Sequence, residues 1–547
     1  MSKTNIVKIA VMAVVLVAII LLAILLPVEN AGGSMYFATF MSLVPPIVAI
    51  GLALITKEVY SSLFVGIVLA SLFAANYSFT GTLDTIINVG LITTVAESAG
   101  IFIFLVVLGI IVALLNRAGG AQAFGKWAET HVKTRVGALI ATFALGVLIF
   151  IDDYFNCLTV GAVMRPLTDK HKISRAKLAY VIDATAAPIC MIAPVSSWAA
   201  AVSGCVESDT MSGIELFVRA IPFNFYSLLT IVFVVLLAVM GFDYGRMSEF
   251  EIKAKKGDII GDGKAAEAEE EPETSRARVF DLLIPIVVLI VASVIGLLYV
   301  GGFFGVDAWG YTDYKGDFVG AFGNTDAYIG LPWGALIALV FIILYFFARR
   351  IITPGEAMKC IPQGFIAMVP AILILTFATG LKNVTGLLGT DAYVEAVLGN
   401  AGTLQKFLPA IIFLVACFLA FATGTSWGTF GILIPIVTAL FAETEPIFFV
   451  GVSACLAGAV CGDHCSPISD TTIMASAGAQ CNHVVHVQTQ LPYAITVAAV
   501  SFVAYIFAGF VSIAWIALPV AIALMVGALF GLKFYFAKKA ATAPDAE

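Results

Sequence analysis

Apolar segments long enough to cross a membrane recur along almost the whole sequence, and they limit the fold more than any other feature. Because of them the chain is 61% hydrophobic and only 12% charged, with a mean hydropathy of +1.03. A water-soluble protein of this length carries about twice that share of charged residues. We therefore predict an all-α polytopic membrane protein. The predicted spans lie near 6–28, 36–56, 59–75, 100–116, 136–168, 178–205, 221–241, 279–300, 332–348, 364–381, 405–442, 446–476, 491–512 and 515–537.

Charge and motif content exclude several classes of function. The net charge of -7 argues against a nucleic-acid partner, which would require a broad basic face. Glycine-rich phosphate loops are absent from the sequence, so an ATP-driven pump is not indicated, and neither an enzyme nor a cofactor is predicted. The nine cysteines are odd in number and lie mostly inside apolar runs, which favours free thiols.

The distribution of charge also divides the chain. The run 6–28 is too long for a signal-peptide core, so residues 1–34 are expected to form a retained transmembrane helix. A mixed-charge, low-complexity stretch at 243–278 predicts a cytoplasmic linker without a fold of its own, between a first transport repeat (35–242) and a second (279–547). Lys and Arg are enriched in cytoplasmic loops, and their positions predict a multi-pass protein of the cytoplasmic membrane with both termini inside.

One predicted span has arginine at both ends. Arg135 and Arg165 both belong on the cytoplasmic side, although the stretch between them is apolar and is broken by Asp152-Asp153. A re-entrant helical hairpin resolves the conflict, because an arm of roughly 15 residues reaches about 22 Å, past the midplane of a ~30 Å core. The segment 405–442, broken at Thr423–Ser426, predicts a second hairpin that enters from the opposite side.

Short sequence matches relate the two halves. Pro194-Val-Ser196 lies 273 positions before Pro467-Ile-Ser469, and Asn156, Thr159 and Gly161 lie 270 positions before Ser426, Thr429 and Gly431. Together with the layout, these matches predict two inverted repeats, each with a re-entrant hairpin and a discontinuous helix. In transporters with this architecture the binding site lies at the repeat interface.

Polar side chains at the predicted breaks are candidates for ion binding, because ionisable groups are costly inside a membrane. At the first hairpin tip one aspartate could bind a cation or proton while the other caps the returning helix. The run Gly462–Thr472 is the most specific, since two carboxylates, an imidazole and four hydroxyls interrupt an apolar segment. The cation and proton candidates are Asp152, Asp153, Asn156, Thr159, Ser196, Ser197, Thr423, Thr425, Ser426, Asp463, His464, Ser466, Ser469, Asp470 and Thr471.

Structural roles compete with these assignments. Pro194 could simply kink a helix whose serines bond back to the preceding turn, and the small residues around Thr423 could serve helix packing. His464 could be a neutral side chain fixed by a hydrogen bond. Arg165 could contact an anionic substrate, although a cytoplasmic anchor is the commoner role. Asp183 is expected to pair with Lys177 or Arg175 at a helix end.

Several longer motifs resemble those of a known family. GDHCSPISDTTIMAS, from Gly462 to Ser476, and HVVHVQTQLPYA, from His483 to Ala494, look like the signature of NhaC-type sodium/proton antiporters. The stretch IDDYFNCLTVGAVMRPLTDKHKISRAKLAY, from Ile151 to Tyr180, and APVSSW resemble the first-repeat motif of that family. The resemblance covers most of the chain from about Tyr36 onward. It implies the fold of the ion-transporter superfamily, with inverted repeats, paired hairpins, a homodimer and an elevator-type motion.

The resemblance also implies a site and a function. The leading hypothesis is a secondary active transporter that exchanges sodium for protons by alternating access, with Asp470 or Asp463 as the shared carrier. The alternative keeps the fold but moves a small organic acid or amino acid, coupled to sodium or protons, with Arg165 among its contacts. A passive channel or a membrane-embedded enzyme is disfavoured by the twin broken repeats and by the missing nucleophile–base set. The sodium ligands implied are Asn156, Ser426, Asp463, Ser469 and Asp470.

Overall fold

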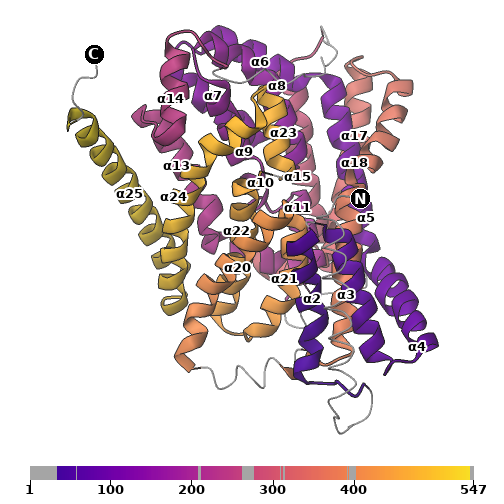
Figure 1. Cartoon of the computed structure of the whole chain (residues 1–547). Coiled ribbons are helices and arrows are strands. Elements are labelled where there is room, and N and C mark those ends of the chain that lie inside the picture. The colour runs from indigo at the N-terminus through magenta and orange to yellow at the C-terminus, as the bar shows by residue number, and fades with distance from the viewer. Residues whose placement is uncertain are drawn as a thin grey trace, which may run out of the picture.

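The computed structural model describes residues 34–56, 58–206, 211–260, 276–307, 310–311, 314–390, 392–393, 402–467 and 469–542. The helix predicted for 6–28 lies outside the described residues. Within them, nine helices are long and apolar enough to cross a membrane, so the prediction of a helical polytopic protein is confirmed (Figure 1). The strands among the described residues are β1 (Val306–Asp307) and β2 (Gly310–Tyr311), which form a small hairpin.

The elements of the first half follow one another closely. They are η1 (Phe40–Leu43), α2 (Val44–Thr56), α3 (Val59–Ala74), α4 (Phe79–Asp84), the π-helix η2 (Thr85–Thr93), α5 (Thr94–Ala118), α6 (Gly120–His131), α7 (Arg135–Leu148), α8 (Asp153–Lys170), α9 (Arg175–Thr185), α10 (Ala187–Cys190), α11 (Ser197–Gly204), α12 (Gly213–Ala220), η3 (Ile221–Phe223), α13 (Phe225–Met240) and α14 (Gly245–Lys255).

The second half has fewer and longer helices. They are α15 (Phe280–Val300), α16 (Phe318–Gly323), α17 (Ala327–Ala348), α18 (Pro354–Gly386), η4 (Gly402–Phe407), α20 (Leu408–Thr423), α21 (Ser426–Leu440), α22 (Pro446–Cys465), α23 (Asp470–Ala479), α24 (His483–Phe510) and α25 (Ala514–Thr542).

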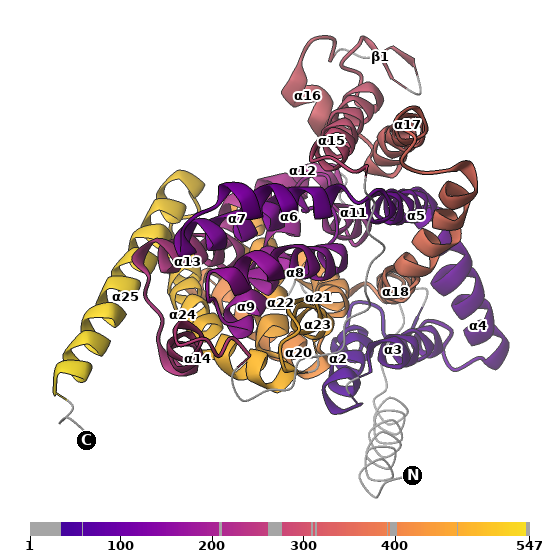
Figure 2. The ribbon, with the colours of Figure 1, turned by 90° about the horizontal axis from the view of Figure 1, so that it is seen from above.

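Two groups of helices stand side by side when the molecule is seen from above (Figure 2). In one group, α5 packs against α17 and α18, and α15 packs against α17. The contact between α5 and α18 is very close, because a Cβ on Gly109 would collide with the carbonyl of Gly364. The other group holds α7–α9, α13 and α20–α24, which include three of the four broken segments predicted from the sequence, α7–α8, α20–α21 and α22–α23.

Helices α7 and α8 form a helical hairpin. The Arg135 guanidinium, at the start of α7, donates a hydrogen bond of 3.2 Å to the carbonyl of Lys172, just beyond the end of α8. The two arms are therefore antiparallel and return the chain to the end from which it entered. The Thr134 hydroxyl caps the N-terminus of α7, and the turn between the arms covers residues 149–152.

The second broken segment is α20–α21, in the lower part of Figure 1, whereas α7–α8 lies in its upper part. Helix α20 runs parallel to α22, because Phe413 lies beside Gly458 and the Phe421 carbonyl accepts a hydrogen bond from Ser466 Oγ at 2.7 Å. Gly424, with φ +72°, ends α20 in the left-handed conformation that glycine adopts without strain. Helix α21 then begins at Ser426 and packs against α18, α20 and α22.

Two further helices are interrupted where the sequence predicts breaks. Residues 191–196 separate α10 from α11, and residues 466–469 separate α22 from α23. Ser196 and Ser469 are the N-caps of α11 and α23. The starts of α8 and α21 and the starts of α11 and α23 are separated by the same 273 residues (426 − 153 and 470 − 197).

Part of the stretch predicted to have no fold of its own is helical. In α14, Met247 and Phe250 are buried, and the Glu251 carboxylate accepts hydrogen bonds from Arg135 and, at 2.9 Å, from the Ser174 backbone N–H. These contacts bind α14 to the first hairpin and order a composition that would not fold alone. Residues 261–275 lie outside the described part of the chain.

Candidate functional site

Four interruptions of helical structure meet in the middle of the molecule. The tip of α7–α8 touches the start of α11, because the Ser197 N–H donates to the Ile151 carbonyl at 3.0 Å. The tip of α20–α21 touches α22 through Ser426 Oγ, which donates to the Ala459 carbonyl at 3.2 Å. The Trp198 and Trp427 rings, with centroids 5.6 Å apart, join the starts of α11 and α21. Segments far apart in the sequence thus share one buried centre.

The α22–α23 break carries a buried carboxylate, Asp463. Its Oδ2 accepts a hydrogen bond of 3.0 Å from Thr471 Oγ1, which also lies 3.2 Å from Ser469 Oγ. Ser469 Oγ in turn caps α23 by accepting from the Thr472 N–H. Asp463 is 2% exposed, and its Oδ1 has no hydrogen-bond partner among the described residues. The break therefore presents one carboxylate oxygen and two hydroxyls, and no ion pair of Asp463 is found among the described residues.

The tip of the first hairpin adds two more buried carboxylates. Asp152 accepts a hydrogen bond of 3.4 Å from Ser197 Oγ. Asp153, in the first turn of α8, is completely buried, and neither carboxylate oxygen has a hydrogen-bond partner in the described part of the chain. The charges of Asp152 and Asp463 both act on it. The structure thus brings Asp463 close to Asp152 and Asp153, although at least 310 positions (463 − 153) separate it from them in the sequence.

Asn156 has a double role in this geometry. Its amide nitrogen donates to the carbonyls of Gly146, Ile149 and Thr185, at 2.7, 3.0 and 3.1 Å, and so holds the hairpin tip against the end of α9. Its Oδ1 is buried and, among the described residues, unpartnered. Asn156 therefore remains a candidate ligand through Oδ1, while its amide nitrogen has a structural role.

Other predicted hydroxyls bond mainly to the backbone. Ser196 Oγ donates to the Cys190 and Ala193 carbonyls at 2.8 and 2.9 Å, which is the bonding back to the preceding turn that competes with an ion site. Thr423 Oγ1 donates to the Leu419 carbonyl, and Thr425 caps α21. Ser466 bonds to α20 as described above, and Thr159 Oγ1 donates to Asn116 Oδ1 on α5 at 3.2 Å. These hydroxyls therefore stabilise the helix breaks and their contacts with neighbouring helices.

Two charged candidates lie away from the buried carboxylates. Asp470, the first residue of α23, is exposed and accepts one long hydrogen bond, of 3.4 Å, from Tyr154. Arg165 lies towards the far end of α8, where the charges of Asp169 and Arg175 act on it. Asp463 rather than Asp470 is thus the enclosed carboxylate of the Gly462–Thr472 run, and Arg165 does not join it.

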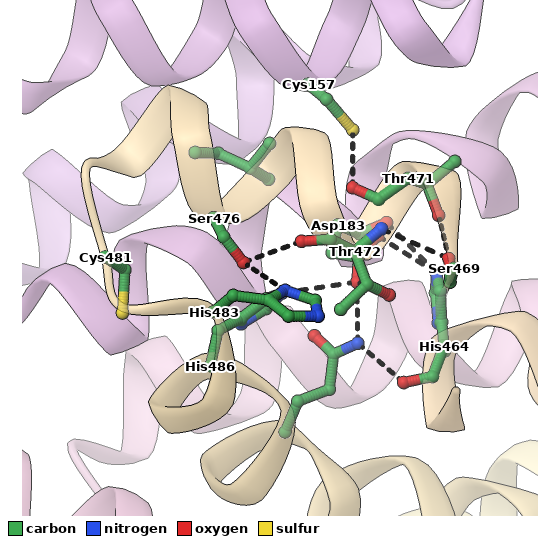
Figure 3. A network of polar contacts seen from close by, with 12 residues as sticks. Cys157, Asp183, His464, Ser469, Thr471, Thr472, Ser476, Cys481, His483 and His486 are labelled. Atoms are coloured by element: carbon green, nitrogen blue, oxygen red, sulfur yellow. Dashed lines mark hydrogen bonds and ion pairs between the residues drawn. The ribbon is translucent and has the colours of Figure 1, made fainter. Parts of the chain in front are cut away.

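A second buried cluster surrounds Asp183 on α9 (Figure 3). Asp183 Oδ2 accepts hydrogen bonds from Thr472 Oγ1 at 3.1 Å and Gln490 Nε2 at 2.6 Å. His486 Nε2 lies 3.4 Å from the same oxygen, and His464 Nε2 lies 3.9 Å from Asp183 Oδ1. We call Asp183, His464 and His486 the histidine–aspartate cluster; all three are buried.

The prediction that Asp183 pairs with Lys177 or Arg175 is wrong. Lys177 Nζ bonds to Asp243 at 2.5 Å, and the Arg175 guanidinium binds both carboxylate oxygens of Asp169. Sequence reasoning missed this because it compared charges only with their neighbours along one helix. The available signal was an aspartate inside an apolar run, the same kind of signal that identified Asp463.

Comparisons with known proteins identify a family and several relatives of this chain. The model of the Na+/H+ antiporter family matches residues 189–510. A protein of Haemophilus influenzae with no assigned function is 38% identical over 489 residues, covering 87% of this chain and 92% of the relative. Another protein of that organism, named an uncharacterised Na+/H+ antiporter, is 28% identical over 141 residues, covering 25% of this chain and 30% of its own.

Two solved transporter structures are distantly similar. MtrF of Neisseria gonorrhoeae, described as illuminating a class of antimetabolite efflux pumps, has a TM-score of 0.48 and 13% identity, covering 83% of this chain and 94% of its own. The YdaH transporter of Alcanivorax borkumensis has a TM-score of 0.46 and 12% identity, covering 76% of this chain and 87% of its own.

Proposed function

This chain belongs to the Na+/H+ antiporter family, and from that premise we propose that it is a secondary transporter that exchanges sodium for protons across the membrane by alternating access. Transport of this kind needs a site that holds either ion but not both at once. The buried carboxylates at the meeting point of the four helix interruptions supply such a site.

The observation that carries the proposal is the set of buried oxygens without partners. Both oxygens of Asp153, Oδ1 of Asn156 and Oδ1 of Asp463 are buried and unpartnered in the described part of the chain. An ionised carboxylate that is buried without a counter-charge is too costly to persist, so it takes up a cation or a proton. Hard cations prefer oxygen ligands, and carboxylate, amide and hydroxyl oxygens are available here.

Competition between the two ions follows from the same charge. A sodium ion between Asp153 and Asp463 would neutralise the carboxylates that a proton would otherwise neutralise. The Thr471 and Ser469 hydroxyls, which lie at the break beside Asp463, would orient its carboxylate in both states. Binding of one ion therefore excludes the other, which is the requirement for exchange rather than cotransport.

The arrangement of breaks supports the further proposal of two inverted repeats. The equal spacing of helix starts and the placement of the two hairpins in opposite halves of Figure 1 are what this architecture requires. Re-entrance of the hairpins from opposite sides follows from it. The homodimer, the elevator motion and the cytoplasmic location of both termini stay predictions.

Site-directed labelling tests the orientation of the hairpins. Single cysteines replace Lys133 and Lys172, which flank α7–α8, and Lys406 and Thr444, which flank α20–α21, on a background whose native thiols are blocked. We expect a membrane-impermeant maleimide to label the first two positions from one side and the last two from the other. Labelling of Lys133→Cys and Lys172→Cys from opposite sides would replace the first hairpin with a through-going helix.

Proton movement in sealed proteoliposomes tests the exchange itself. Vesicles loaded with a pH-sensitive dye receive a sodium pulse outside, and we expect protons to leave as sodium enters, so that the lumen becomes alkaline only when the protein is present. A potassium pulse of equal strength is the control for osmotic and potential effects. Absence of a sodium-dependent response in folded protein would contradict sodium/proton exchange.

A cavity supports organic-solute transport as a second candidate. It has a volume of about 580 Å³ and lies between α18 and α21, with Lys382, Asn383 and Pro435 among its lining residues. Cavities of this size bind small organic molecules. If protein that ignores sodium alone exchanges labelled organic acids or amino acids, and Lys382→Gln weakens that exchange, the second candidate replaces the first.

A further inference from the structure

Helix α6 is a short amphipathic helix at the upper end of the molecule in Figure 1. Its twelve residues are too few to cross a membrane. One face is buried and consists of small and apolar residues, including Ala121, Phe124, Gly125 and Ala128. This face packs against α8 and α15, and a Cβ on Gly125 would lie within 2.9 Å of the Val163 carbonyl oxygen. The helix therefore lies on the protein by one face and presents the other outwards.

The outward face of α6 combines an aromatic ring with positive charge. Trp127 is 47% exposed, and its ring stacks on that of His131, with centroids 4.9 Å apart and 21° between the planes. Lys126, the preceding residue, is exposed as well. Tryptophan is enriched where a membrane meets water, because its apolar ring and its polar N–H suit different surroundings. This face therefore has the composition of a helix that lies in the membrane–water interface.

Three more exposed lysines lie beside this face. Lys133 is in the loop between α6 and α7, whereas Lys170 and Lys172 lie at the end of α8. Hydrogen bonds join the two segments, because Lys170 Nζ donates to the Glu129 carbonyl at 3.2 Å and the Arg135 guanidinium donates to the Lys172 carbonyl at 3.2 Å. One surface thus holds the side chains that we call the lysine–tryptophan patch: Lys126, Trp127, Lys133, Lys170 and Lys172.

Nearby carboxylates leave most of this positive charge uncompensated. The three lysines outside α6 form no ion pair with a described residue. Asp169, at the end of α8, binds Arg175 through both carboxylate oxygens, and Glu251 binds Arg135. Glu129 is then the remaining acidic residue of these segments, against four lysines. A partner that matches the patch must be negatively charged.

We propose that the lysine–tryptophan patch binds the headgroups of anionic phospholipids in the membrane leaflet at this end of the protein. The lysines donate hydrogen bonds to phosphate oxygens, and the Trp127 ring lies between the headgroups and the acyl chains. Four or more basic residues on an amphipathic helix or beside a membrane span are typical of anionic-lipid recognition. The apolar ring adds an anchor that charge alone does not supply. The proposal does not depend on which ion the protein transports.

Bound lipid would act on the first hairpin. The patch joins α6, the loop that enters α7, and the end of α8, so a headgroup shared by its lysines holds the open end of α7–α8 together. A ligand that binds the folded protein stabilises it by mass action. We therefore expect anionic lipid added to the protein in detergent to raise the melting temperature more than the same amount of zwitterionic lipid does.

Tryptophan quenching by brominated lipids tests binding at the patch itself. The full-length protein is reconstituted into phosphatidylcholine vesicles that contain a minor fraction of brominated phosphatidylglycerol or of brominated phosphatidylcholine. The chain has six tryptophans, so the contribution of Trp127 is the difference between the wild type and Trp127→Phe. We expect an apparent affinity about tenfold higher for the phosphatidylglycerol, since each lysine near an anionic surface adds about fivefold.

Two double variants separate the patch from the overall charge of the protein. Lys133→Gln/Lys172→Gln should lower the preference for phosphatidylglycerol by about fivefold or more. The control, Lys359→Gln/Lys533→Gln, removes the same charge from exposed positions on α18 and α25 and should change the preference less than about twofold. An unchanged melting temperature in detergent without added lipid establishes that each variant is folded.

Three results would overturn the proposal. Equal quenching of Trp127 by the two brominated lipids would show that the patch does not select anionic headgroups. Quenching by neither lipid would show that α6 does not face the membrane and that another partner covers it. An equal loss of preference in the two double variants would assign the effect to net charge rather than to this surface.

Discussion

Neutralising each of the two aspartates of the Gly462–Thr472 run in turn should show which of them binds sodium. Asp463→Asn keeps the shape of the side chain and an oxygen that can accept the 3.0 Å hydrogen bond from Thr471, so the break should stay folded. What it removes is the negative charge. Two unit charges about 4 Å apart interact by about 4 kcal/mol at an effective dielectric of about 20. Since each 1.4 kcal/mol is about tenfold, sodium affinity should fall roughly a thousandfold.

Asp470→Asn is the matched control. It removes the same charge seven residues later, but from an exposed side chain with one 3.4 Å contact, where solvent screens the interaction. Its effect on sodium affinity should be less than about tenfold, corresponding to about 1 kcal/mol.

Equilibrium binding of radioactive sodium to the purified variants measures both effects. Monodisperse elution and an unchanged melting temperature establish that each variant is folded. The reasoning is refuted if Asp463→Asn binds sodium within about threefold of the wild type, or if Asp470→Asn is the variant that loses binding.

Three further substitutions probe the structure around the site, each by thermal unfolding in detergent. Asn156→Ala leaves three carbonyls at the hairpin tip without their donor and should cost about 2–4 kcal/mol; an unchanged midpoint would show that the tip does not depend on it. Gly478→Ala forces a Cβ against the Cys157 carbonyl and should cost about 1–3 kcal/mol, while Gly527→Ala, with open space around it, should be neutral or slightly stabilising. Equal effects of the two glycine variants would contradict a close α8–α23 contact. Glu251→Gln breaks the contact between α14 and Arg135 and should cost about 2 kcal/mol more than the exposed Glu249→Gln; no difference would mean that α14 is not anchored there.

The sequence predicted the positions of the breaks well, because a polar run inside an apolar segment has few physical explanations. The hairpin between Arg135 and Arg165 followed from a conflict between charge and hydropathy, and the structure has two antiparallel arms there. The Gly462–Thr472 run likewise predicted the interruption between α22 and α23. Both predictions needed only local pattern and membrane thickness.

Contacts between distant segments could not be predicted in the same way. Asp183 and His486 lie about 300 residues apart, and nothing in either segment indicates the other as partner. The prediction from composition that 243–278 has no fold of its own is wrong for α14. Glu251 of this helix is held by Arg135 and Ser174, which lie far away in the sequence.

The roles of hydroxyls were the least predictable feature. Ser196 has the residue type of a cation ligand, yet helix ends need hydrogen bonds for free backbone groups, and its hydroxyl serves two carbonyls and the α11 cap. At Asn156 the amide nitrogen does the same while the oxygen remains unpartnered among the described residues. Which atom is left for an ion depends on backbone geometry that sequence alone does not give.

The central claim is that sodium and protons compete for one set of buried carboxylates and so move in opposite directions. Its most direct test records uptake of radioactive sodium and release of luminal protons in the same proteoliposomes while the sodium gradient is varied. The account predicts that the two fluxes stay in a fixed ratio and vanish together in Asp463→Asn. Sodium uptake that proceeds without proton movement, or that persists in this variant, would contradict it.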